Sequence, residues 1–234
     1  MNVALILSGG IGSRVGADIP KQYVKVNNRM IVTYSLKTIC GHPEIDAVQI
    51  VADSVWQESI LEELANVSAY AGKVRGFSIP GKNRQLSIYN GLKDIKAYAG
   101  ADSAVLIHDA ARPLLTSEQI TSCMNALEGH DGVLPVLPMK DTVYLSNDGQ
   151  SVSRLLNRSL LYAGQAPEVF LLDRYLEANE RLLPDAILSI NGSTEPAIMA
   201  GMDVAMIAGD ENNYKITSRA DLDSFIDSLG KGAE

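Results

Sequence analysis

The sequence has few cysteines, fewer basic than acidic residues, and no long apolar run. Cys40 and Cys123 form no CxxC pair and no Cys/His cluster, so we expect reduced thiols in the cytoplasm rather than a disulfide or a zinc site. The 20 Lys and Arg residues against 28 Asp and Glu residues give a net charge of −8, which disfavours nucleic-acid binding through a basic face. No apolar stretch approaches the roughly 20 residues of a membrane span. The first residues also lack the basic segment of a signal peptide, so we expect no membrane association.

The sequence does contain enough apolar material for a sizeable core. Hydrophobic residues make up 46% of the 234 residues, and the chain has no internal repeat, low-complexity tract or linker. We therefore expect a single domain over residues 1–234. Because the net charge is negative, a small anionic substrate would need a local basic pocket, so the positions of Arg and Lys are informative.

Short apolar runs alternate with longer stretches of helical period. This alternation predicts an α/β fold with a Rossmann-like, mostly parallel sheet and helices on both faces. In such sheets, ligands bind beyond the carboxyl ends of the strands, and motifs follow the predicted strands after Leu7, Ile79 and Ile107. The predicted strands are 2–7, 47–51, 73–79, 103–107, 132–137 and 204–208, and the predicted helices are 31–39, 55–65, 84–98, 117–127 (with Ser117 as N-cap), 171–181 and 220–229.

Residues from about 139 to 162 interrupt this rhythm. Two alternating segments, 141–145 and 151–156, flank a turn at 146–149 and predict a β-hairpin that projects as an arm. An isolated hairpin is marginally stable in water. We therefore expect the arm to pack on a second subunit in a homodimer.

A glycine-rich loop follows the first predicted strand. Residues 8–14 read SGGIGSR, and Pro20-Lys21-Gln22 follows. The loop lacks the Lys-Ser or Lys-Thr of a P-loop, and Val15 occupies the third position of the dinucleotide fingerprint. A phosphate-cradling loop with Arg14 and Lys21 nearby suits a triphosphate that gains charge in the transition state. The alternative is a tight turn with two solvated cations.

Six ordered motifs along nearly the whole chain resemble one enzyme family. They are similar to the signature of the cytidylyltransferases that act on 2-C-methyl-D-erythritol 4-phosphate or ribitol 5-phosphate. The motifs are GGIGSR (9–14) with PKQ (20–22), GKNRQLSIYNGL (81–92, preceded by Pro80 where the family has Gly), HDAARP (108–113), KDT (140–142), NR (157–158) with QAP (165–167), and NYKIT (213–217).

The resemblance implies a CTP-dependent enzyme that needs Mg²⁺ and transfers a cytidylyl group to a polyol phosphate, with release of pyrophosphate. It implies that Arg158 reaches the acceptor from the arm of a partner subunit. The implied catalytic residues are Arg14, Lys21, Arg158 and Lys215. The implied nucleotide-binding residues are Ser8, Gly9, Gly10, Gly12, Gly81, Arg84, Ser87 and Asp109, and Asp109 is also expected near the metal. The implied acceptor-binding residues are Arg112, Thr142, Arg158 and Lys215.

This chemistry explains the shortage of proton-transfer groups. An attacking phosphate is already ionised at neutral pH, so the enzyme needs positioning and charge stabilisation rather than a general base. We expect His108 to have a core role, and Asp109 could alternatively cap the turn that follows it. Without the resemblance, Arg158 would be interpreted as a solvated charge and Lys215 as part of a polar loop before the last helix.

Some residues depart from the family pattern and leave the acceptor open. Ala166 stands where the family mostly has Thr, Glu168 where it has Gln, and residues 191–197 (NGSTEPA) replace a Thr-Asp element. Either methylerythritol phosphate or ribitol phosphate is compatible with the sequence. Two other hypotheses are a nucleotide-binding homologue that has lost catalysis and, less favoured, an NAD-type oxidoreductase with Asp53 as its ribose-binding acid.

Overall fold

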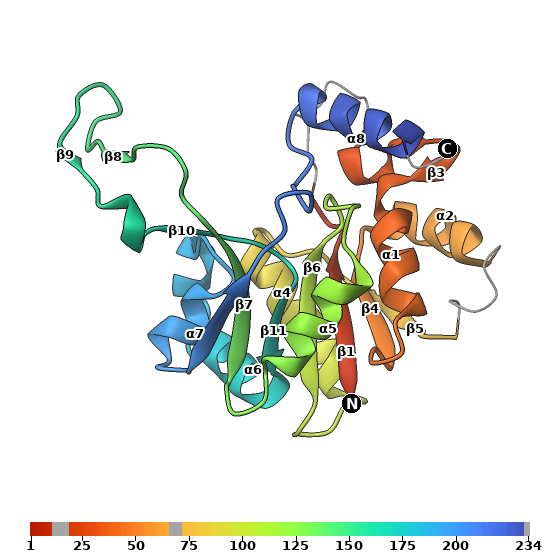
Figure 1. The fold of residues 1–234 in the computed structure, drawn as a ribbon. Helices are drawn as coiled ribbons and strands as arrows, with labels where there is room; N and C mark the ends of the chain where they lie inside the picture. Colours follow the sequence, from red (N-terminus) through yellow and green to blue (C-terminus); the bar gives the residue numbers. More distant parts are fainter. Residues whose placement is uncertain (11–18, 66–71, 232–234) are drawn as a thin grey trace.

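The computed structural model describes residues 1–10, 19–65 and 72–231. Within these residues, eight strands form one sheet in the order β10-β7-β11-β6-β1-β4-β5, and the eighth strand, β12, pairs parallel with β7 (Figure 1). The strands are β1 (Asn2–Leu7), β4 (Ala47–Val51), β5 (Val74–Ser78), β6 (Ala104–Asp109), β7 (Gly132–Pro138), β10 (Tyr162–Gly164), β11 (Glu168–Leu171) and β12 (Val204–Ala208). The predicted strands are confirmed to within two residues at each end.

The centre of the sheet is parallel and fully buried. β1 lies between β4 and β6, with Val3 opposite Ala47 on one side and Val105 on the other. Strands covered on both faces are expected to be continuous apolar runs, as these are. β10 and β11 were not predicted, and both run antiparallel to β7. They are three and four residues long, too short to show a period, and β11 begins with the charged Glu168.

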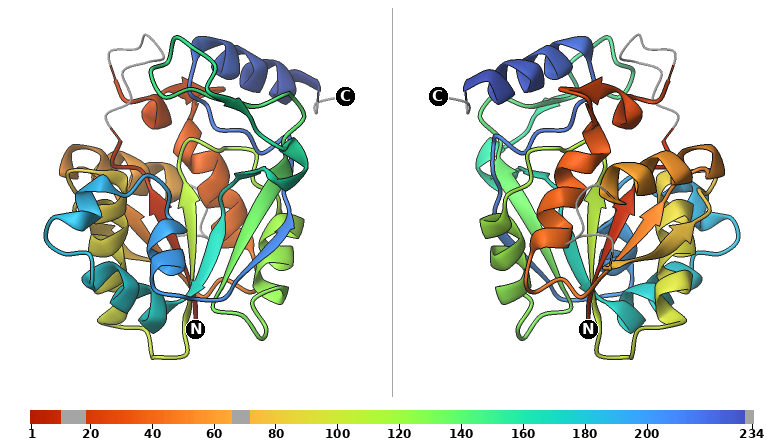
Figure 2. Two further views of the ribbon diagram at one scale, coloured as in Figure 1. Left: turned by 90° about the vertical axis from the view of Figure 1, so that its left-hand side faces the viewer. Right: turned by 90° about the vertical axis from the view of Figure 1, so that its right-hand side faces the viewer.

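Helices cover both faces of the sheet, as Figure 2 shows. On one face, Leu36 of α1 and Ile120 of α5 belong to the same buried cluster. On the other, Ile88 of α4 packs in a cluster with Tyr175 of α6. The helices are α1 (Ile31–Gly41), α2 (Ser54–Ala65), α4 (Arg84–Lys96), α5 (Ser117–Asn125), α6 (Leu172–Glu180), α7 (Glu195–Met199) and α8 (Arg219–Lys231). The predicted α/β architecture with helices on both faces is confirmed.

Hydroxyl side chains cap two of these helices. The N-cap of α5 is Thr116 rather than the predicted Ser117, because the Thr116 hydroxyl accepts the N–H of Gln119 at 3.2 Å and Ser117 is already helical. α8 lies above the carboxyl ends of the strands in Figure 1. At its start, the Ser218 hydroxyl accepts the N–H of Asp221 at 3.2 Å.

The arm extends away from the sheet, at the upper left of Figure 1. It contains β8 (Tyr144–Leu145) and β9 (Arg154–Leu155), which pair antiparallel and are shorter than the predicted segments. The Asp148 carboxylate orders the turn, because it accepts the N–H groups of Gln150 and Ser151 at 2.8 Å each. A second small hairpin joins β2 (Lys25–Val26) to β3 (Arg29–Met30). None of the helices in the described ranges is long and apolar enough to cross a membrane.

Candidate active site

A cavity of about 460 Å³ opens at the carboxyl ends of β1, β5 and β6, where the sequence predicted the site. It is bounded by the loop after β1, the start of α4 and the turn after β6. The lining residues are Leu7, Gly9, Gly10, Lys21, Gln22, Gly81, Lys82, Asn83, Arg84, Ser87, Asp109, Ala110, Ala111 and Lys215. Of the predicted nucleotide-binding and catalytic residues, Arg14 and Gly12 lie outside the described residues.

The side chains of Gln22 and Tyr23 form hydrogen bonds to the loop after β1. The Gln22 amide donates to the carbonyl oxygens of Ser8 (2.8 Å) and Gly10 (2.6 Å). The Ser8 hydroxyl is buried and donates to the Tyr23 hydroxyl at 3.0 Å, so Ser8 shapes the loop and does not line the cavity. Gln22 was not predicted as a site residue, although it adjoins Lys21 in the PKQ motif.

The N-terminus of α4 forms the opposite wall. The Asn83 side chain caps the helix by accepting the N–H of Leu86 at 2.8 Å. The Ser87 hydroxyl accepts the Gly81 N–H and donates to the Asn83 carbonyl, both at 2.9 Å. A Cβ at Gly81 would lie 2.6 Å from the Leu86 backbone, so only glycine fits. The wall therefore presents the positive end of a helix to the cavity.

Three cations surround one buried carboxylate at the end of β6. Asp109 lies 3.1 Å from Arg84, 3.0 Å from Lys215 and 3.6 Å from Arg112. Burial alone would raise the pKa of Asp109, but the charges of these cations lower it well below its usual range. Asp109 is therefore ionised at neutral pH and fixes the positions of three positive side chains.

A second cavity of about 350 Å³ lies beside the first. It shares Arg84, Asp109 and Lys215 with the first cavity, so the ion-paired cluster is a common wall. Arg112 also lines it and is held in place by a 2.6 Å hydrogen bond to the Asn213 carbonyl. The other lining residues are Leu134, Gly164, Gln165, Ala166, Glu168, Asn191, Gly192, Ser193 and Thr194.

Glu168 is a second buried carboxylate on the wall of this cavity. The sequence marked it only as a departure from the family pattern and did not predict it as a site residue. It accepts hydrogen bonds from the hydroxyls of Ser193 and Thr194, the latter at 3.4 Å. Burial raises the pKa of Glu168, and the charge of Arg84 offsets this only in part. The loop that carries the two hydroxyls is ordered by Glu195, which accepts the Asn191 N–H at 2.9 Å.

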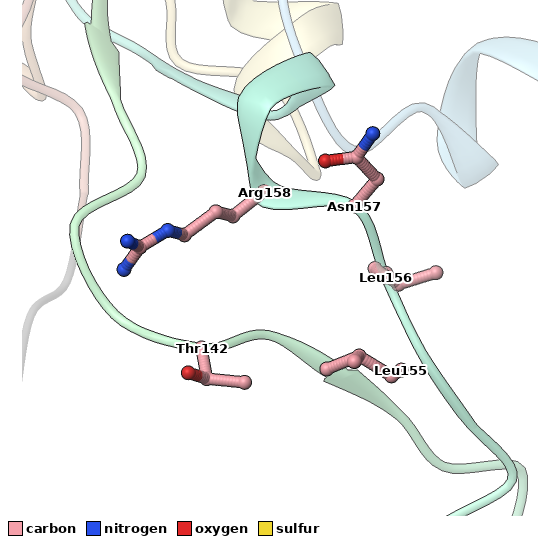
Figure 3. Close-up of a pocket in the computed structure, with 5 residues that line it drawn as sticks. All are labelled: Thr142, Leu155, Leu156, Asn157 and Arg158. Carbon is pink, nitrogen blue, oxygen red and sulfur yellow. The ribbon is translucent and has the colours of Figure 1, made fainter.

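Thr142 and Arg158, both predicted to bind the acceptor, lie on the arm. They line a cavity of about 450 Å³ together with Leu155, Leu156 and Asn157 (Figure 3). Arg158 donates to the Lys140 carbonyl at 2.6 Å. Neither residue lines the second cavity of its own chain.

His108 was expected to have a core role, and Asp109 was expected to lie near the metal. The Nε2–H of His108 donates to the Arg112 carbonyl at 3.0 Å, and burial lowers the pKa of His108 to about 4. His108 is thus a neutral core residue. In the described ranges, no group of three His, Cys, Asp or Glu side chains could hold a metal ion, and Asp109 is already paired with cations. The predicted place of Asp109 near a metal ion stays a prediction.

Comparison with known proteins identifies the family of this chain. The sequence model of the 2-C-methyl-D-erythritol 4-phosphate cytidylyltransferases matches residues 2–226. The chain is 34% identical to the 2-C-methyl-D-erythritol 4-phosphate cytidylyltransferase of Neorickettsia sennetsu, covering 96% of this chain and 95% of that protein. It is 32% identical to the ribitol-5-phosphate cytidylyltransferase of Vibrio parahaemolyticus, covering 96% and 94%.

Solved structures give the same result. The crystal structure of the 4-diphosphocytidyl-2C-methyl-D-erythritol synthase of Anaerococcus prevotii matches with a TM-score of 0.81 and 25% identity, covering 98% of this chain and 96% of that one. The chain therefore belongs to the 2-C-methyl-D-erythritol 4-phosphate cytidylyltransferase family.

Proposed function

We propose that this enzyme transfers a cytidylyl group from CTP to the phosphate of a polyol phosphate, forming a CDP-polyol and releasing pyrophosphate. The observation that carries the proposal is the pair of cavities with a common wall of Arg84, Asp109 and Lys215. Two anionic substrates in these cavities would have their phosphates on either side of the same cations. Family membership and the names of the relatives support the same reaction.

In this reaction, a phosphate oxygen of the acceptor attacks the α-phosphorus of CTP. The new P–O bond forms as the bond between the α-phosphorus and the bridging oxygen breaks, and pyrophosphate leaves with that electron pair. No proton needs to be removed, because the attacking phosphate is ionised. Lys21 and Lys215 would stabilise the negative charge that develops on the transferred phosphate. The ion pairs with Asp109 would hold Arg84, Arg112 and Lys215 in fixed positions between the two substrates.

We propose Mg²⁺ as a partner of the substrate rather than a resident of the protein. The described residues offer no cluster of metal ligands, whereas Mg²⁺ commonly binds through substrate phosphates. The cation would then enter with CTP. The two free, buried cysteines, Cys40 and Cys123, suit a cytoplasmic enzyme.

We also propose a homodimer in which each arm completes the partner's acceptor site. Apolar side chains on the arm are exposed, including Val152 at 67% and Leu160 at 74%. The acceptor-binding candidates Thr142 and Arg158 lie on the same arm, away from their own chain's second cavity. Mixing Arg158→Ala and Lys215→Ala subunits tests this, because one site of the mixed dimer would be intact and activity would return. Two inactive parents whose mixture stays inactive would contradict the arrangement.

The first experiment is to measure pyrophosphate release from CTP with Mg²⁺ and either 2-C-methyl-D-erythritol 4-phosphate or ribitol 5-phosphate. The relatives carry both names, so the assay decides the acceptor. Turnover with either supports the proposal. Binding of CTP without turnover on any polyol phosphate would instead support a homologue that has lost catalysis.

A further inference from the structure

Glu168 has an unusual environment for a buried carboxylate. It is 7% exposed and borders the second cavity. No ion pair joins it to a Lys or Arg in the part of the chain that the structure describes, although Arg84 is near enough to influence its pKa. Its hydrogen-bond donors are the hydroxyls of Ser193 and Thr194.

The sheet register places Glu168 next to the reaction cluster. Glu168 pairs with Ile107 across the antiparallel β11–β6 ladder, and Asp109 lies two residues further along β6. Residues two apart on a strand share a face. Glu168 and Asp109 are therefore diagonal neighbours on one face, but the cations pair with Asp109.

This arrangement gives the wall of the second cavity two chemically different groups, the cations around Asp109 and the carboxyl group of Glu168. The phosphate of an acceptor is attracted to Arg112 and Lys215 and repelled by an ionised Glu168. Each carboxylate oxygen has two lone pairs, and each accepts one hydroxyl from the protein. The remaining lone pairs suit uncharged donors, because a buried carboxylate is stabilised by hydrogen bonds.

We propose that Glu168 selects the acceptor by accepting hydrogen bonds from hydroxyls of the polyol chain. This inference rests on the proposed function and specifies its substrate class. The acceptor is a polyol monophosphate that carries free hydroxyls and no second anionic group.

The test compares acceptors on the wild-type enzyme and on Glu168→Gln. The measured quantity is the ratio of kcat/KM for the full polyol phosphate to kcat/KM for an analogue that lacks two of its hydroxyls. Hydrogen bonds to charged groups predict a wild-type ratio of roughly 10–100. Glu168→Gln should bring the ratio to within a few-fold of one, with the KM for CTP unchanged. Glu180→Gln, the same change at an exposed position of α6, should keep the wild-type ratio.

Each outcome decides a different point. A wild-type ratio near one would overturn the role of Glu168 without any variant, even if Glu168→Gln fails to fold. An unchanged ratio in a well-folded Glu168→Gln would do the same, as would efficient use of an acceptor with a carboxylate in place of a hydroxyl. Absence of turnover with every polyol phosphate would overturn the proposed function itself, and this inference with it.

Discussion

Replacing Asp109 by asparagine is the most direct test of the charge cluster. The substitution keeps the shape of the side chain and removes the one negative charge that three cations share. Removing one partner from a buried ion pair typically destabilises a protein by about 3–5 kcal/mol. Arg84 and Lys215 are about one-third exposed, so solvent screens part of the effect. We therefore expect a loss of about 2–4 kcal/mol.

Thermal unfolding measures this loss. For a protein of this size, 2–4 kcal/mol corresponds to roughly 4–16 °C in Tm. Asp173→Asn is the control, because Asp173 forms an exposed pair with Lys96 and should change stability by less than about 1 kcal/mol. Inorganic phosphate at constant ionic strength should raise the Tm of Asp109→Asn more than the Tm of the wild type, because the cations that no longer pair with Asp109 can bind phosphate.

The pH dependence has a definite sign. Because the pKa of Asp109 is lowered in the folded state, its contribution to stability is present above its ordinary pKa of 3.8 and is lost as the pH falls below that value. The difference in the free energy of unfolding between the wild type and Asp109→Asn should therefore become smaller at acidic pH. Equal Tm values for the two proteins at pH 7, without a response to phosphate, would refute the view that Asp109 organises the cations.

Three further predictions concern other parts of the site. Lys21→Ala should reduce kcat by roughly two or more orders of magnitude, which is the effect of losing a group that stabilises charge in the transition state. Its circular dichroism spectrum should be unchanged, and near-normal turnover would argue against the role of Lys21. Gly81→Ala should cost about 1–3 kcal/mol and raise the KM for CTP, because its Cβ would meet Leu86 at 2.6 Å; an unaltered Tm and KM would contradict the close packing. Burial lowers the pKa of His108 from 6.5 to about 4, so the free energy of unfolding should fall by about 3 kcal/mol as the pH falls between those two values. In His108→Gln, the free energy of unfolding measured with urea should depend less on pH over this range.

The sequence predicted the parts of the fold that have strong local signals. β1, β4 and β6 are apolar runs, and the motifs that follow β1, β5 and β6 do meet at one edge of the sheet. Lys215 and Asp109 are separated by 106 residues, yet they form a 3.0 Å ion pair. Motif resemblance placed both near the substrates, but no local pattern could predict that they touch.

Other features depend on tertiary context. Glu168 is buried, whereas a glutamate is expected to be exposed. The sequence pattern therefore predicted neither the strand β11, which begins at Glu168, nor the place of Glu168 in the site. The N-cap of α5 was misplaced by one residue, because Thr116 and Ser117 are equally suitable hydroxyl caps and only the backbone geometry distinguishes them. In the proposed homodimer, the position of Thr142 and Arg158 relative to an acceptor would depend on a second chain, which a single sequence does not describe.

The common wall between the two cavities has a kinetic consequence. A CDP-polyol carries the nucleoside, both phosphates and the polyol in one molecule, so it would occupy both cavities and contact Arg84 and Lys215 from either side. Linking two bound groups in one molecule raises affinity through effective concentration. The product should therefore dissociate more slowly than either substrate, which favours product release as the step that limits turnover.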